Sequence, residues 1–201
     1  MFSEAKEAKR VLERLEVMAQ TLAGASLAVL SRENGEIARH SLSRQPERRS
    51  SFCVTLREGK QGCRHCLACR RIVLYSAHFR GLKEYTCHGG IHMLVAPVTR
   101  SGKSSATPYA IISSPFANPD RERGWHAVKT HTLNAKVDLE KLRSAYYALP
   151  ALTEERKAIM LCVVDVAAAT FAEALPRLRT WRQENASPPE SAETLSRDRK
   201  S

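Results

Sequence analysis

The chain has 201 residues, of which 43% are hydrophobic, and carries a formal net charge of +11. This length and composition fit one globular domain with a core of its own. The N-terminus has no apolar stretch typical of a signal peptide, and the longest apolar run, 159–175, contains Asp165 and Glu173 and is too short to cross a bilayer. We therefore expect a cytoplasmic protein with no membrane segment, where clustered cysteines indicate metal or redox chemistry more often than disulfides.

Hydrophobic periodicity predicts the secondary structure of the first 80 residues. Apolar side chains recur at helical spacing up to residue 22, and the turn sequence Glu33-Asn34-Gly35 follows a short apolar run. Gly59 and Gly62 are expected to interrupt a helix. The predicted elements are a helix over 4–22, a strand over 26–31, an irregular arginine-rich segment over 36–50, a short helix beginning at 52–56 and a helix over 63–79.

The second half of the chain predicts strands and then helices. A strand signal is interrupted by Gly89-Gly90, and the apolar runs after it predict a β-hairpin. The predicted elements are a strand over 85–99, a hairpin over 91–113, a loop over 117–134, a helix over 138–149 and a long helix over 153–179. This order predicts the α+β class, with one antiparallel sheet flanked by helices.

The last predicted helix is apolar on nearly all of its faces, which is typical of a helix buried in a core or in a homodimer interface. We expect its cysteine, Cys162, to be a buried thiol of the core. After residue 183 the composition changes to proline, serine, glutamate and arginine. We therefore predict a disordered tail over 184–201.

Five of the six cysteines lie within 35 positions, and the centre of this cluster is two consecutive C-x-x-C steps, Cys63-x-x-Cys66-x-x-Cys69. Thiolates at this spacing are a common way for a short segment to offer soft ligands to one metal. An iron–sulfur cluster is the first choice, although the proline that follows the cysteines of bacterial ferredoxins is missing. A zinc site is the second, with His65 or His88 as further ligands. Buried thiols without metal are the alternative.

Much of the positive charge lies in the segment 39–83, which holds eleven lysines and arginines against two acidic residues, a net +9. Such a segment could form a nucleic-acid-binding zinc module. Alternatively, the cations lower the pKa of nearby cysteines and stabilise an anionic metal–thiolate centre, or they form a solvated basic face. No serine–histidine–aspartate spacing, phosphate-binding loop or pair of carboxylates indicates an enzyme.

Several short motifs in the middle of the chain resemble the PocR sensory domain. They are Phe52-Cys53, Cys63-Arg-His-Cys66, Tyr85-Thr-Cys87-His88-Gly89-Gly90 and Ala96-Pro97-Val98. The likeness covers roughly residues 10–180, so the domain is expected over 1–183. By position the family cysteines fall on Cys53, Cys63, Cys66 and Cys87, and Cys69 is extra.

The resemblance implies a PAS-like α+β domain that senses small organic molecules, such as simple hydrocarbon derivatives, in bacterial or archaeal regulation of transcription. Family members usually carry an output domain, and none is recognised here. The chain is therefore expected to act through a separate output protein or as a homodimer, or its output domain lies outside this sequence. Together these arguments predict a non-enzymatic sensor with a metal centre, iron–sulfur or zinc, ligated by Cys53, Cys63, Cys66 and Cys87, next to a small-molecule pocket.

Overall fold

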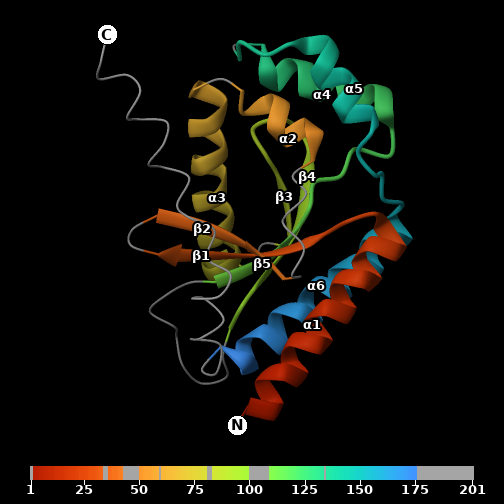
Figure 1. Ribbon diagram of the computed structural model, residues 1–201. Coiled ribbons are helices and arrows are strands. Elements are labelled where there is room, and N and C mark those ends of the chain that lie inside the picture. The colour runs from red at the N-terminus through yellow and green to blue at the C-terminus, as the bar shows by residue number, and fades with distance from the viewer. Residues whose placement is uncertain are drawn as a thin grey trace.

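The computed structural model describes residues 2–33, 36–42, 50–58, 60–80, 83–99, 109–133 and 135–175. Within these residues the chain forms five strands and six helices (Figure 1). In chain order they are α1 (Phe2–Ala23), β1 (Leu27–Glu33), β2 (Glu36–Ser41), α2 (Ser51–Leu56), α3 (Lys60–Arg80), β3 (Glu84–Thr86), β4 (His92–Pro97), β5 (Tyr109–Ser113), α4 (Arg121–Thr132), α5 (Leu139–Tyr147) and α6 (Glu154–Ala174). The predicted α+β fold, with an antiparallel sheet, flanking helices and a long C-terminal helix, is confirmed.

The five strands form one sheet in the order β2-β1-β5-β4-β3, and every neighbouring pair is antiparallel. β1 lies inside the sheet, where Leu30 pairs with Arg39 of β2 on one side and with Ala110 of β5 on the other. β5 in turn pairs with β4 through Ile112 and Val95. The predicted hairpin over 91–113 corresponds to β4 and β5.

Side chains alternate between the two faces of this sheet, as expected for β-strands. Val29 and Ile111 belong to the largest core cluster, which α1 and α6 complete. Leu30 and Ile112 belong to a second cluster, which they form with residues of α3. The sheet therefore separates a layer made of α1 and α6, which lie side by side, from α3 on the opposite face (Figure 1).

The short helices α2, α4 and α5 gather at one end of the molecule (Figure 1). Their cluster is rich in aromatic rings: the Tyr146 ring lies 6.3 Å from Phe52 and 5.8 Å from Trp125, centroid to centroid. Phe52 is fully buried at the first turn of α2. This packing fixes α2, and with it Cys53, against the rest of the domain.

Two segments that were expected to be irregular are regular elements. Residues 36–41 form the edge strand β2, in which Ile37 is buried against the α3 face. The prediction of an irregular segment was wrong here because β1 supplies the hydrogen-bonding partner, so few apolar residues are needed. The rest of that segment, 43–49, lies outside the described residues.

The predicted loop over 117–134 contains the helix α4, so this prediction was also wrong. Asp120 caps the helix by accepting a hydrogen bond from the Arg123 N–H at 3.0 Å. Glycine is unfavourable inside a helix, but a Cβ atom on Gly124 would lie 2.0 Å from the Tyr146 hydroxyl oxygen. The glycine therefore marks close packing between α4 and α5.

Gly62 has a similar role in α3, which begins at Lys60 and includes this glycine, although Gly62 was expected to lie between two helices. A Cβ atom on Gly62 would lie 1.9 Å from the carbonyl oxygen of Leu56, the last residue of α2. The missing side chain thus allows α2 and α3 to meet closely. Gly59 lies outside the described residues.

The long helix α6 confirms the predicted C-terminal helix, and Thr153 caps it by accepting a hydrogen bond from the Arg156 N–H. Cys162, however, is exposed on α6, so the prediction of a buried thiol was wrong. The reason is that α6 contacts α1 and the sheet along one side, leaving the other side outward. The predicted tail over 184–201 and the domain boundary at 183 lie outside the described residues.

Candidate functional site

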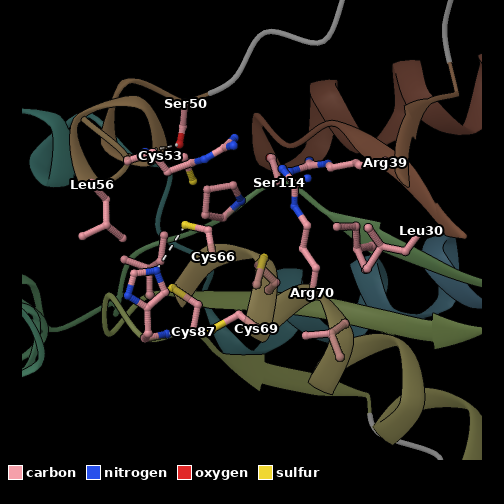
Figure 2. A pocket seen from close by; sticks show the side chains of 17 residues that line it. Leu30, Arg39, Ser50, Cys53, Leu56, Cys66, Cys69, Arg70, Cys87 and Ser114 are labelled. Atoms are coloured by element: carbon pink, nitrogen blue, oxygen red, sulfur yellow. Dashed lines mark hydrogen bonds between the residues drawn. The ribbon is translucent and has the colours of Figure 1, made fainter. Parts of the chain in front are cut away.

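A cavity of about 70 Å³ lies between α2, α3 and the α3-facing side of the sheet (Figure 2). By the same measure a single water needs about 10–15 Å³, so the cavity has room for a compact ligand. Its lining combines thiols, arginines and apolar side chains. Four of the six cysteines take part: Cys53, Cys66, Cys69 and Cys87.

These four thiols come from three separate segments of the chain. Cys53 lies on α2, whose N-cap Ser50 accepts a hydrogen bond from the Cys53 N–H at 3.2 Å. Cys66 and Cys69 are three residues apart on α3 and therefore share a helix face. Cys87 follows β3 in the turn that leads to β4. We call this part of the cavity, with His88, the thiol end.

Three of the four cysteines predicted as ligands are thus brought to the cavity, and the fourth is not. Cys63 does not line it; its sulfur accepts a hydrogen bond from the Arg57 guanidinium at 3.7 Å. Cys69, which appeared to be extra in the sequence, is buried in the lining instead. Whether any of them binds a metal stays a prediction.

The thiol end is held by hydrogen bonds to sulfur. The Sγ atom of Cys66 lies 3.1 Å from Nε2 of His88, and the His88 backbone N–H donates to the Cys69 sulfur at 3.3 Å. The Gly89 N–H donates to the sulfur of Cys87, also at 3.3 Å. The turn 87–90 therefore binds α3 through its backbone as well as its side chains.

The protonation states follow from burial. Desolvation, with a smaller contribution from the nearby Cys53, raises the pKa of Cys66 and of Cys87 to about 12 each. Desolvation, together with His65, lowers the pKa of His88 to about 4. At neutral pH this gives protonated thiols beside a neutral imidazole, the reverse of the thiolate–imidazolium pair of a cysteine nucleophile.

The described residues contain no group of three or more histidine, cysteine, aspartate or glutamate side chains arranged to hold a metal ion as they stand. The sulfurs are turned toward their hydrogen-bond partners in the turn 87–90. The four cysteines of the lining are free thiols.

Comparison with protein families matches residues 7–174 to the sensory domain found in PocR. The chain belongs to the PocR sensory domain family. No curated protein and no solved structure gives a significant match. The resemblance seen in the sequence motifs is thereby confirmed, and the chain is a ligand-sensing signalling domain, which points to a non-enzymatic role. None of the described helices is long and apolar enough to cross a membrane.

The histidines of this PocR domain differ in their relation to the cavity. His88 lines it, and the exposed His65 lies close by, with 5.3 Å between the two ring centroids. His92 stacks on Phe116 and lies 3.2 Å from a carboxylate oxygen of Glu84. Of these three histidines, His88 is the one that lines the cavity.

Sequence reasoning missed the individual arginines of the site. Arg39, Arg57 and Arg70 line the cavity, whereas in the sequence they were three of many cations in the segment 39–83. Arg57 and Arg70 both lower the pKa of Cys66 through their charge, against the larger effect of burial. The available signal was that Arg57 and Arg70 lie close to the cysteines in the sequence. Use of the same segment as a nucleic-acid-binding surface stays a prediction.

Proposed function

We propose that this PocR domain senses its signal through a metal centre at the thiol end of the cavity, an iron–sulfur cluster in first place or zinc in second, beside the space for a small molecule. The observation that carries the proposal is that one cavity gathers Cys53, Cys66, Cys69 and Cys87 from three segments. Four thiolates are the ligand set that both kinds of centre use. The reducing cytoplasm is the compartment that suits such thiols.

The ligand set differs by one residue from the set expected from the sequence, with Cys69 in the place of Cys63. Rotation of the cysteine side chains about χ1 would turn the sulfurs from their hydrogen-bond partners into the cavity. Binding would release the thiol protons, because a metal takes thiolates rather than thiols. The cations of Arg57 and Arg70 then offset the negative charge of the metal–thiolate centre.

The strands β4 and β5 offer a route from the cavity to α6. Met93 and Ile112 line the cavity, while their neighbours Leu94 and Ile111 belong to the core cluster shared with α6. A second link runs from β3, which leads to Cys87: Glu84 of this strand forms an ion pair with Lys157 of α6. A change at the thiol end would therefore reach α6 through two adjacent elements, and α6 would pass it to a separate output protein or a second copy of the chain.

Metal analysis and visible absorption of the protein purified without oxygen test the proposal. We expect iron or zinc in near-stoichiometric amount, and a loss of most of it in the double variant Cys66→Ser/Cys69→Ser. The control is Cys162→Ser, because Cys162 is exposed on α6 and lies away from the cavity lining.

The variant Cys63→Ser separates the two ligand sets. Full metal content in Cys63→Ser and loss in Cys69→Ser support the cavity set, and the opposite pattern supports the set expected from the sequence. Wild-type protein with neither iron nor zinc would end the metal proposal and leave a sensory domain with a metal-free cavity.

A further inference from the structure

The cavity has a second end, away from Cys87 and Leu56, that the thiols do not reach. Arg39 extends into it from β2, Arg70 from α3 and Ser114 from the residue after β5. In Figure 2 the side chains of the two arginines reach toward the same region, next to Ser114. We call these three residues the arginine end.

The charge of the lining favours a negative ligand. The lining includes three arginines, Arg39, Arg57 and Arg70, and among the described residues that line it there is no aspartate or glutamate. Arginine stays protonated in proteins, so the positive charges persist at any working pH. An anion placed between two guanidinium groups is attracted by both of them, and this attraction is stronger where the surroundings are partly desolvated.

The arginines do not share one task. Arg57 donates to the sulfur of Cys63 and acts on Cys66, so it belongs to the thiol end. Arg39 lies on the other side, on the edge strand β2, paired through the backbone with Leu30. Arg57 therefore acts at the thiol end, whereas Arg39 reaches toward the arginine end (Figure 2).

The other side chains at the arginine end define the shape of the ligand. Leu30, Val73 and Ile112 provide an apolar wall. The Oγ atom of Ser114 accepts a hydrogen bond from the Ser26 N–H at 3.0 Å, so its own hydrogen can be donated into the cavity. A planar guanidinium matches the two oxygens of a carboxylate. The volume of about 70 Å³ limits the rest of the molecule to a short chain.

We propose that the arginine end binds the carboxylate of a short-chain organic acid, with Arg39 and Arg70 on the carboxylate oxygens and the alkyl part against Leu30, Val73 and Ile112. The inference rests on the proposed function in one respect, that the cavity is where the domain senses its signal. It does not require a metal at the thiol end.

Calorimetric titration with butyrate and with 1-butanol tests the charge requirement on the unaltered protein, since the two molecules share a carbon chain. We expect butyrate to bind and to raise the melting temperature, and 1-butanol to do neither. Equal binding of the two, or binding of the alcohol alone, would overturn the inference while leaving the cavity as a sensing site.

Variants of the two arginines test whether their side chains bind the carboxylate. Arg70→Gln and Arg39→Gln should each weaken butyrate binding by about 10- to 100-fold, the usual effect of losing a charged hydrogen-bond donor. Arg71→Gln is the matched control, because Arg71 is the next residue of α3 and is exposed. Binding in Arg70→Gln equal to that in Arg71→Gln contradicts the proposal.

Metal content and butyrate binding can be measured separately on the same samples. If protein that contains no iron or zinc binds butyrate, the result supports this inference and contradicts the metal proposal. A metal-loaded protein that does not bind butyrate removes this inference alone.

Discussion

The two faces of the sheet are formed by the same strands but have different surroundings. On the α1–α6 face most of the buried side chains are apolar, with Met160 and Val164 fully inaccessible. On the α3 face an apolar layer surrounds Leu74. Nearer to α2, the same face carries the thiols, the histidine and the arginines that line the cavity. The comparison indicates that one face supplies most of the stability, while the other accepts polar and titratable groups that a binding site needs.

The largest effect is expected from breaking the apolar face. Met160→Ala removes a fully buried side chain from the cluster of α1, α6 and the sheet, and should lower the free energy of unfolding by about 2–5 kcal/mol in urea denaturation. Ile159→Ala is the control, since Ile159 is the neighbouring residue and is 47% exposed. This variant should change the free energy of unfolding by about 0.5 kcal/mol or less. Similar losses in the two variants would show that this face does not dominate stability.

A smaller effect is expected where the cavity face depends on close backbone packing. Gly62→Ala puts a methyl group against the Leu56 carbonyl oxygen and should destabilise the fold by about 1–3 kcal/mol, although alanine favours a helix over glycine. The same change pushes α2 away from α3, so the occupancy of the proposed metal centre should fall because Cys53 moves away from Cys66. Gln61→Ala, at the exposed preceding residue, is the control. A variant with full stability and full metal content would contradict the packing argument.

The smallest effect is expected at the ion pair between the two regions. Glu84 raises the pKa of Lys157 above its ordinary value of 10.5. The pair therefore stabilises the fold fully below pH 10.5, and this contribution is lost as the pH rises through the raised pKa. Lys157→Met should cost about 0–1 kcal/mol at neutral pH, measured by urea denaturation. The difference from the wild type should vanish at pH values well above 10.5; a difference that persists there would show that the lysine acts through packing.

The elements that face the apolar core were predictable from the sequence. Helices α1, α3, α5 and α6 and strands β1, β4 and β5 carry their apolar residues at helical or strand spacing. β2 and α4 were not predictable because each of them depends on contacts with another element of the fold. β2 forms on the edge of β1, and α4 contains Gly124 only because Tyr146 packs against it.

The cysteine cluster indicated a shared site, but the choice between Cys63 and Cys69 depended on the orientation of α3. Cys63, Cys66 and Cys69 are equally spaced, so spacing alone cannot say which pair faces the sheet. Cys69 is buried, as are Val73 and Ala77, four and eight residues further on, and this buried stripe determines which face of α3 packs against the sheet. The stripe was visible in the sequence, whereas the gathering of Arg39 with Arg70 required the paired strands β1 and β2.

The exposed thiol of Cys162 has a practical consequence. Because the other five cysteines are buried or half-buried, a maleimide dye applied briefly under native conditions should react first on the outer side of α6. Fluorescence from that position would report movement of the helix while the sulfurs of the cavity stay unmodified. The molecule thus carries a native attachment point for observing its own response to added compounds.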